Sequence, residues 1–288
     1  MNNDYLKNYS DLHLLLRMKY PTDKENVFVD VGAFRGGFSS AFAKRGWRVI
    51  AFEPEPGNFK LLTERVNKNP NITCVQKAVT DISGKQVPFF VDRNYPARNS
   101  LQPVSSDHQP SINIDTIRLD DNLSELNIRE VTVLKIDAEG ADFHALKGFD
   151  FTNIKPVLIM IEFNDQRTRE HFGYDHHDII SFMKPYKYDV FILETGNRKR
   201  FEFNYQVGST QYKLKGIEEY PYKPDPKMGN IVFIQRTQTQ TFEHVYQSYL
   251  DDLDKYKIIR IPIQLIRKTF VNIPYAKRLY YLLRRIIS

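Results

Sequence analysis

The sequence predicts an α/β fold built on a mostly parallel sheet of seven strands, followed by a basic helical tail. Three observations predict it. Apolar strand signals alternate with helix signals of about ten residues, the pattern of parallel strands joined by crossover helices. The first strand runs into a turn with glycines at positions 32, 36 and 37. Residues 255–288 hold nine Lys and Arg and no Asp or Glu. We therefore expect one large domain with an appendage.

The elements follow in chain order. Seven strands are expected at residues 27–31, 48–52, 72–76, 131–136, 157–163, 189–193 and 230–234. Helices are expected within 4–19 and at 38–44, 59–67, 141–146 and 175–184. Residues 84–116 interrupt the alternation with a hairpin strand at VPFFVD and a polar, turn-rich stretch that predicts a mobile loop. The predicted organisation is a helical lead-in over 1–25, a main domain over 26–240 and a helical extension over 241–288.

Composition indicates a folded protein of the cytoplasm. Apolar residues make up 41% of the chain, which argues against global disorder. Cys74 is the single cysteine, so an internal disulfide is excluded and a reducing compartment fits best. The first 20 residues lack the apolar core of a signal peptide, and no uncharged apolar run could span a bilayer. We expect a cytoplasmic protein, held at most at a membrane surface.

The charge is divided unevenly along the chain. The first 254 residues carry 32 basic and 35 acidic side chains, a net of −3, whereas the last 34 carry +9. Apolar residues in this tail recur at helical spacing on either side of Pro274, which predicts two short amphipathic helices. Basic charge opposite an apolar face favours an anionic membrane surface over residues 255–288. Packing on the domain or on a dimer mate is the alternative, and a mildly acidic body argues against nucleic acid.

The glycine turn predicts a nucleotide-type ligand. Asp30, Gly32 and Gly36 have the spacing D-x-G-x-x-x-G, which fails the dinucleotide fingerprint G-x-G-x-x-G. This spacing resembles the first motif of S-adenosylmethionine (SAM)-dependent methyltransferases. Glu53 ends the second strand, 21 residues beyond Gly32, where a carboxylate can accept both ribose hydroxyls. An acid in this place fits either ligand and indicates an adenosine.

Later segments resemble one family of methyltransferases. AFEPEPGNFKLL, KAVTDISG, IDTIRLDD, VLKIDAEGADFHALKG and VLIMIEFN come in the order of the FkbM-type SAM-dependent methyltransferases. The resemblance covers residues 26–164, and the run at 135–140 is its most specific part, with Ala138 in place of the usual Val. It implies a Rossmann-like, seven-stranded class I methyltransferase fold, SAM as cofactor and O-methylation of sugars or natural products.

The resemblance also implies roles for individual residues. Asp30, Gly32 and Gly36 would hold the methionine portion of SAM, and Glu53 its ribose. The adenine would lie beside Ala78 and Val79, with Asp81 as a further candidate. Asp137 and Glu139 would end the fourth strand beside the sulfonium. These positions should converge at the carboxyl edge of the sheet.

A sugar hydroxyl is a weak acid, so its methylation calls for a general base or a metal. Asp137 and Glu139 are the first candidates for the base, although Glu139 could instead only cap the following helix. His171 is a third candidate, ahead of the adjacent His176 and His177. Other expectations concern neighbours of these residues: Glu162 as the partner of the strand residue Lys135, Asn99 and Ser100 in the acceptor pocket, and an oxygen-ligand metal set, possible but not favoured, of Asp137, Glu162, Asn164 and Asp165.

The resulting hypothesis is a SAM-dependent O-methyltransferase acting on a hydroxyl of a glycan or lipid-linked saccharide at the inner membrane face. One alternative is a membrane-recruited, non-catalytic binding protein with the same fold. An RNA methyltransferase is the less favoured alternative. The acceptor and the oligomeric state are beyond the sequence.

Overall fold

The computed structural model describes residues 10–21, 25–66, 69–92, 94–194, 211–214 and 228–248. Residues 19–239 form one compact unit, and the described residues 10–18 and 240–248 belong to a second. The second unit contains α2 (Ser10–Arg17), within the expected first helix, and most of a helix over 239–248. The basic tail over 255–288 lies outside the described residues, and the domain boundaries stay a prediction. Among the described helices, none has the length and apolarity needed to cross a membrane.

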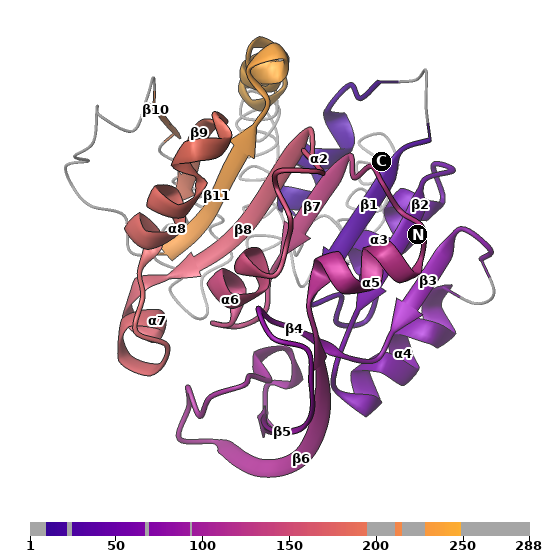
Figure 1. The fold of residues 1–288 in the computed structure, drawn as a ribbon, viewed down its shortest axis with the longest axis vertical. Coiled ribbons are helices and arrows are strands. Elements are labelled where there is room, and N and C mark those ends of the chain that lie inside the picture. The colour runs from indigo at the N-terminus through magenta and orange to yellow at the C-terminus, as the bar shows by residue number, and fades with distance from the viewer. Residues whose placement is uncertain are drawn as a thin grey trace, which may run out of the picture. The chain divides into compact units, whose positions relative to one another are not determined.

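The main unit is built on an eight-stranded sheet with the order β10-β9-β11-β8-β7-β1-β2-β3 (Figure 1). Its parallel part consists of β1 (Val27–Val31), β2 (Arg48–Phe52), β3 (Ile72–Val75), β7 (Val133–Ile136) and β8 (Leu158–Asn164). β11 (Met228–Ile234) lies antiparallel between β8 and β9 (Asp189–Glu194). These are the seven expected strands, and the predicted fold class is confirmed. β10 (Gln211–Leu214) adds an edge strand that the sequence analysis did not predict.

The central strands are mostly apolar because they are buried within the sheet. All residues of β1 and β7 are buried, as expected where helices cover a parallel sheet. The helices of this unit are α3 (Gly37–Ala43), α4 (Pro56–Val66), α5 (Leu119–Glu125), α6 (Asp142–Lys147), α7 (Asp165–His171) and α8 (His176–Met183). Short 3-10 turns are η1 (Pro96–Arg98), η2 (Lys184–Tyr186) and η4 (Arg236–Gln238). Because β1, β2, β7 and β8 are parallel, their carboxyl ends meet at one edge of the sheet, and the site is built there.

A second, three-stranded sheet accounts for the interruption after β3. β6 (His108–Ile117) pairs in parallel with β4 (Ala78–Val79) and antiparallel with β5 (Gly84–Asp92). Figure 1 shows this hairpin extending beyond the end of the main sheet. The expected hairpin strand is present, but the last residues of the expected loop belong to β6. The remaining connection, residues 94–107, is called the strap below.

Two helices, α5 and α7, were not predicted. α7 has the sequence DQRTREH, which lacks any apolar repeat. It begins because the side chain of Asn164 accepts a hydrogen bond from the backbone N–H of Arg167 at 3.2 Å, an N-cap. This helix brings Arg167 to the site.

Candidate active site

The glycine turn after β1 is shaped by contacts within the protein. Gly32 has a φ of +72°, and a Cβ there would lie 1.8 Å from the carbonyl oxygen of Asp137. Gly36 has a φ of +73°, and its Cβ would lie 2.6 Å from Cδ1 of Leu62 in α4. Gly32 therefore excludes a side chain before any ligand is considered, and at Gly36 the positive φ disfavours one. The sequence analysis assigned these glycines to a ligand, and the structure adds close packing as a second reason for them.

Glu53, at the end of β2, is held by two backbone donors. Its Oε2 accepts from the N–H of Phe34 at 2.9 Å, and its Oε1 accepts from the N–H of Glu55 at 3.0 Å. Burial raises the pKa of Glu53 to about 8, and the two backbone hydrogen bonds oppose that rise. Each carboxylate oxygen can accept one further hydrogen bond, so the group fits the two ribose hydroxyls assigned to it.

Asp30 and Lys135 form a buried polar pair beneath the turn. Asp30 is 1% exposed, its Oδ2 accepts from Ser39 Oγ at 2.6 Å, and its Oδ1 lies 3.5 Å from Nζ of Lys135. Nζ also lies 3.3 Å from Oδ2 of Asp137. Burial opposes the charge of Lys135, but Asp137 and Asp30 outweigh it and raise its pKa.

The expected pair of Lys135 with Glu162 was therefore wrong. Strand register gives the reason, because Lys135 stands opposite Asp30 on β1 and opposite Met160 on β8. Glu162 lies two residues further along β8, beyond the direct partner of Lys135. The sequence showed a buried lysine but not the register that chooses its partner.

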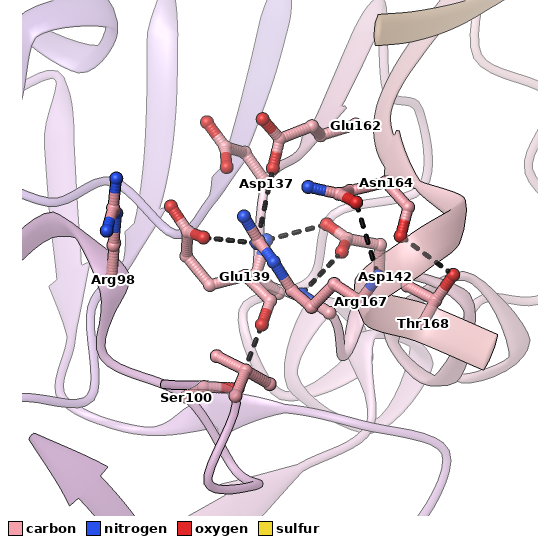
Figure 2. A network of polar contacts seen from close by, with 12 residues as sticks. Arg98, Ser100, Asp137, Glu139, Asp142, Glu162, Asn164, Arg167 and Thr168 are labelled. Atoms are coloured by element: carbon pink, nitrogen blue, oxygen red, sulfur yellow. Dashed lines mark hydrogen bonds and ion pairs between the residues drawn. The ribbon is translucent and has the colours of Figure 1, made fainter. Parts of the chain in front are cut away.

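An acidic cluster lies at the ends of β7 and β8 (Figure 2). Asp137, Glu139 and Glu162 each bring a carboxylate oxygen within 4.8 Å of the others. Arg167 forms an ion pair with Glu139 through Nη1, which also lies 3.9 Å from Oε2 of Glu162. The sequence analysis assigned no role to Arg167, which lies outside the quoted segments, or to Asp142, which lies within VLKIDAEGADFHALKG.

The cluster contains more carboxylates than cations, and the pKa values of Glu139, Asp142 and Glu162 are raised. Burial raises the pKa of Glu139 to about 7 and that of Asp142 to about 6, with further contributions from Asp137. Burial, Asp137 and Glu139 raise the pKa of Glu162 well above its ordinary value, against the effect of Arg167. An excess of carboxylates in a partly desolvated place favours a cationic ligand.

Asp142 folds the turn that presents Glu139. Its two oxygens accept from the N–H groups of Ala138 at 2.7 Å and Gly140 at 2.9 Å. Glu139 sits at a φ of +52°, and a Cβ on Gly140 would lie 2.4 Å from the ring of Phe172. The acid that bonds the backbone ahead of α6 is thus Asp142, which leaves the side chain of Glu139 for Arg167 and the cluster.

The strap connects both sides of this sheet edge. The side chain of Asn58 in α4 donates to the carbonyl of Pro96 at 3.0 Å, and Ser100 Oγ donates to the carbonyl of Glu139 at 2.8 Å. Ser100 thus contacts the turn that carries Glu139, and its place in the acceptor pocket stays a prediction. Asn99 ties the strap to the end of β5, where its Oδ1 accepts from the N–H of Asp92 at 2.9 Å.

The residues expected near the adenine lie in β4 and beyond. Ala78 and Val79 are buried. Asp81 is drawn toward α6, with its carboxylate 3.3 Å from His144 Nδ1 and 3.1 Å from Lys147 Nζ. Their role toward adenine stays a prediction.

His171 and His176 make polar contacts within α7 and between α7 and α8. His171 ends α7, and its Nε2 lies 3.9 Å from Oε2 of Glu170. His176 is buried, with Nδ1 2.7 Å from Oδ2 of Asp165. That pair joins α7 to α8, so Asp165 is engaged away from Asp137 and Glu162. Of the expected metal set, the carboxylates of Asp137 and Glu162 lie together, with Glu139 as a third. Asn164 Oδ1 is engaged by the N–H of Arg167.

Comparisons with known proteins agree with this geometry. The sequence profile described as "Methyltransferase FkbM domain" matches residues 30–190. The chain belongs to the FkbM methyltransferase family. The predicted family is thereby confirmed, and so are the enzyme class and its cofactor, SAM. The roles of individual site residues stay predictions.

Two curated proteins resemble this FkbM chain. One is a "Hexuronic acid methyltransferase AglP" of Haloferax volcanii, 24% identical over 62% of this chain and 70% of that protein. The other is "Methyltransferase 1" of Beauveria bassiana, 26% identical over 45% of this chain and 61% of that protein. A solved FkbM methyltransferase structure from Methylobacillus flagellatus is 18% identical with a TM-score of 0.42, over 73% of this chain and 43% of that one. The chain thus spans less than two thirds of the fungal relative and of that structure.

The residues present fit SAM on two counts. Glu53 keeps an acceptor position on each oxygen for the ribose, and the acidic cluster has the charge that a sulfonium requires. SAM carries an activated methyl group on that sulfonium.

Proposed function

We propose that this chain is a SAM-dependent O-methyltransferase whose acceptor is a hydroxyl of an acidic glycan. The observation that carries the proposal is Glu139, a carboxylate with a pKa of about 7 at the end of β7. It adjoins the strap through Ser100 and the glycine turn through Asp137. The residues assigned to the cofactor and the proposed base therefore lie at the same edge of the sheet.

Glu139 is the base in this proposal. A general base works best when its pKa lies near the working pH, because it is then ionised and still takes up a proton. Arg167 orients the carboxylate and holds it below the pKa that burial alone would give. Asp137, whose side chain is 40% exposed and paired with Lys135, is then free to face the cationic end of the cofactor.

Two observations support an acidic saccharide as acceptor. The archaeal relative is named for hexuronic acid. On the strap, Arg98 is exposed and stands on the opposite side of Glu139 from Arg167 (Figure 2). Its guanidinium lies 4.5 Å from the ring centroid of Tyr95, and no ion pair of Arg98 occurs among the described residues. A carboxylate on a sugar would give this cation a partner.

The test is methyl transfer from labelled SAM to a glucuronide and to the matching glucoside. We expect transfer to the glucuronide in preference, and a product that survives mild alkali as an ether does. Arg98→Gln should remove the preference by raising KM for the glucuronide. An alkali-labile product would mean a methyl ester and would contradict the proposed hydroxyl acceptor. Binding of S-adenosylhomocysteine (SAH) without transfer to any saccharide would favour the non-catalytic binding protein.

Attachment to a membrane is a separate proposal that rests on the sequence of residues 255–288. The nine basic residues and the absence of acid in this segment support a lipid-linked acceptor at an anionic surface. Co-sedimentation with vesicles that contain anionic lipid should require these residues. Equal pelleting of the full chain and a chain that ends at residue 254 would contradict it.

A further inference from the structure

Arg35 is a cation without a counter-ion in the glycine turn. Its Nε is buried and has no hydrogen-bond acceptor, and no ion pair of Arg35 occurs among the described residues. The ring of Phe34 lies beside it, with its centroid 4.8 Å from Cζ. An aromatic face attracts the charge but does not accept the Nε–H. Since buried donors are nearly always satisfied in native proteins, this one calls for an acceptor.

The other cations at this sheet edge are already paired or lie elsewhere. Lys135 lies between Asp30 and Asp137, and Arg167 lies between Glu139 and Glu162. Arg98 is exposed on the strap. Arg35 is thus the half-buried cation of the turn whose charge the described carboxylates leave unmatched.

The position of Arg35 links it to the proposed ribose site. The preceding residue, Phe34, donates its N–H to Glu53 at 2.9 Å, so the turn that carries Arg35 is fixed to Glu53. Asp30, the nearest acid in sequence, is occupied by Ser39 and Lys135. The described carboxylates thus do not supply the acceptor that Arg35 lacks, and an anionic ligand would supply it.

We propose that Arg35 binds the carboxylate of the methionine portion of SAM and SAH, an inference that rests on the proposed function. The cofactor's amino-acid end carries an ammonium and a carboxylate. The acidic cluster suits the ammonium and the sulfonium, whereas the carboxylate requires a cation. A guanidinium presents planar N–H donors, Nε included, that match a carboxylate.

The experiment compares two ligands by calorimetry, SAH and its decarboxylated analogue, which keeps the thioether and the amine. The wild-type chain should prefer SAH by about 10- to 100-fold, the range of a hydrogen bond to a charged group. Arg35→Gln should lose this preference while it binds the analogue as the wild type does. Arg35→Lys should keep part of the preference. Arg129→Gln, the matched control at an exposed arginine with no role in the site, should keep all of it.

Each outcome decides the assignment. If Arg35→Gln keeps the wild-type preference, or if its loss appears only in the KM of the acceptor, Arg35 does not hold the cofactor carboxylate. A wild-type chain that binds both ligands equally overturns the inference and leaves the proposed function standing. A wild-type chain that binds neither overturns both. Thermal unfolding of Arg35→Gln should match the wild type, since the substitution removes an unsatisfied donor and breaks no described ion pair.

Discussion

The two halves of the site differ in how their polar groups are balanced. At the ends of β1 and β2, Asp30 and Glu53 are each engaged by donors within the protein, and the glycines are fixed by packing. At the ends of β7 and β8, carboxylates outnumber cations, and the pKa values of Glu139 and Glu162 are raised. The first half, called the cradle below, is already held in place by the protein. In the second half, burial and neighbouring carboxylates disfavour the ionised carboxylates, and a cationic ligand would favour them. Binding and chemistry are thus divided between neighbouring strand ends.

The largest effect is expected from Gly32→Ala. Its Cβ would lie 1.8 Å from a backbone oxygen, so the strand ends would have to separate. We expect failure to fold, or a loss of more than about 4 kcal/mol. Gly46→Ala is the matched control, since Gly46 has a φ of +82° but no atom within 4 Å of a new Cβ, and it should cost about 1–2 kcal/mol. Equal losses in urea unfolding would contradict the packing argument.

Lys135→Met tests the buried pair of the cradle. It leaves Asp30, 1% exposed, without its cation, and removal of one partner of a buried pair costs about 3–5 kcal/mol. The double variant Asp30→Asn with Lys135→Met should recover most of that loss in the same unfolding experiment. If the double variant is no more stable than the single one, the two side chains do not form the pair.

Glu139→Gln tests the acidic cluster. It removes the proposed base and keeps the shape of the side chain, so turnover should fall about 10²- to 10⁴-fold. SAH affinity should fall far less than turnover, because the cradle is untouched and Asp137 and Glu162 remain to face the ammonium. Glu64→Gln, on the exposed face of α4, is the control. A similar fall in SAH affinity would place Glu139 in the cradle.

A smaller effect concerns protons at Glu53. With a pKa of about 8, Glu53 is mostly protonated at pH 7, and ribose hydroxyls that donate to it favour the ionised form. SAH binding at pH 7 should therefore release a proton, and affinity should rise with pH up to about 8, by at most tenfold per unit. Calorimetry in buffers of different ionisation enthalpy measures the release. The same release in Glu53→Gln would assign the proton to another group.

The cradle could be predicted from the sequence and the cluster only in part. Asp30, the glycines and Glu53 follow strands whose apolar runs mark their ends, so local pattern places them. Arg167 could not be found in this way, because α7 depends on a cap and lacks an apolar repeat. The partner of Lys135 depends on register between strands about a hundred residues apart. Pairing with β4 and β5 likewise forms β6, whose first residues the sequence suggested only as part of a polar loop.

The most direct test of the account is the pH dependence of single-turnover methyl transfer in the wild-type chain and in Arg167→Gln. Because Glu139 must be ionised to act as base, the wild-type rate should rise with pH and level off above about 7. Arg167 lowers the pKa of Glu139, so its removal should move the rise to higher pH. Rates that stay flat between about pH 6 and 9 in both proteins, or a rise that Arg167→Gln leaves in place, would contradict the role of Glu139.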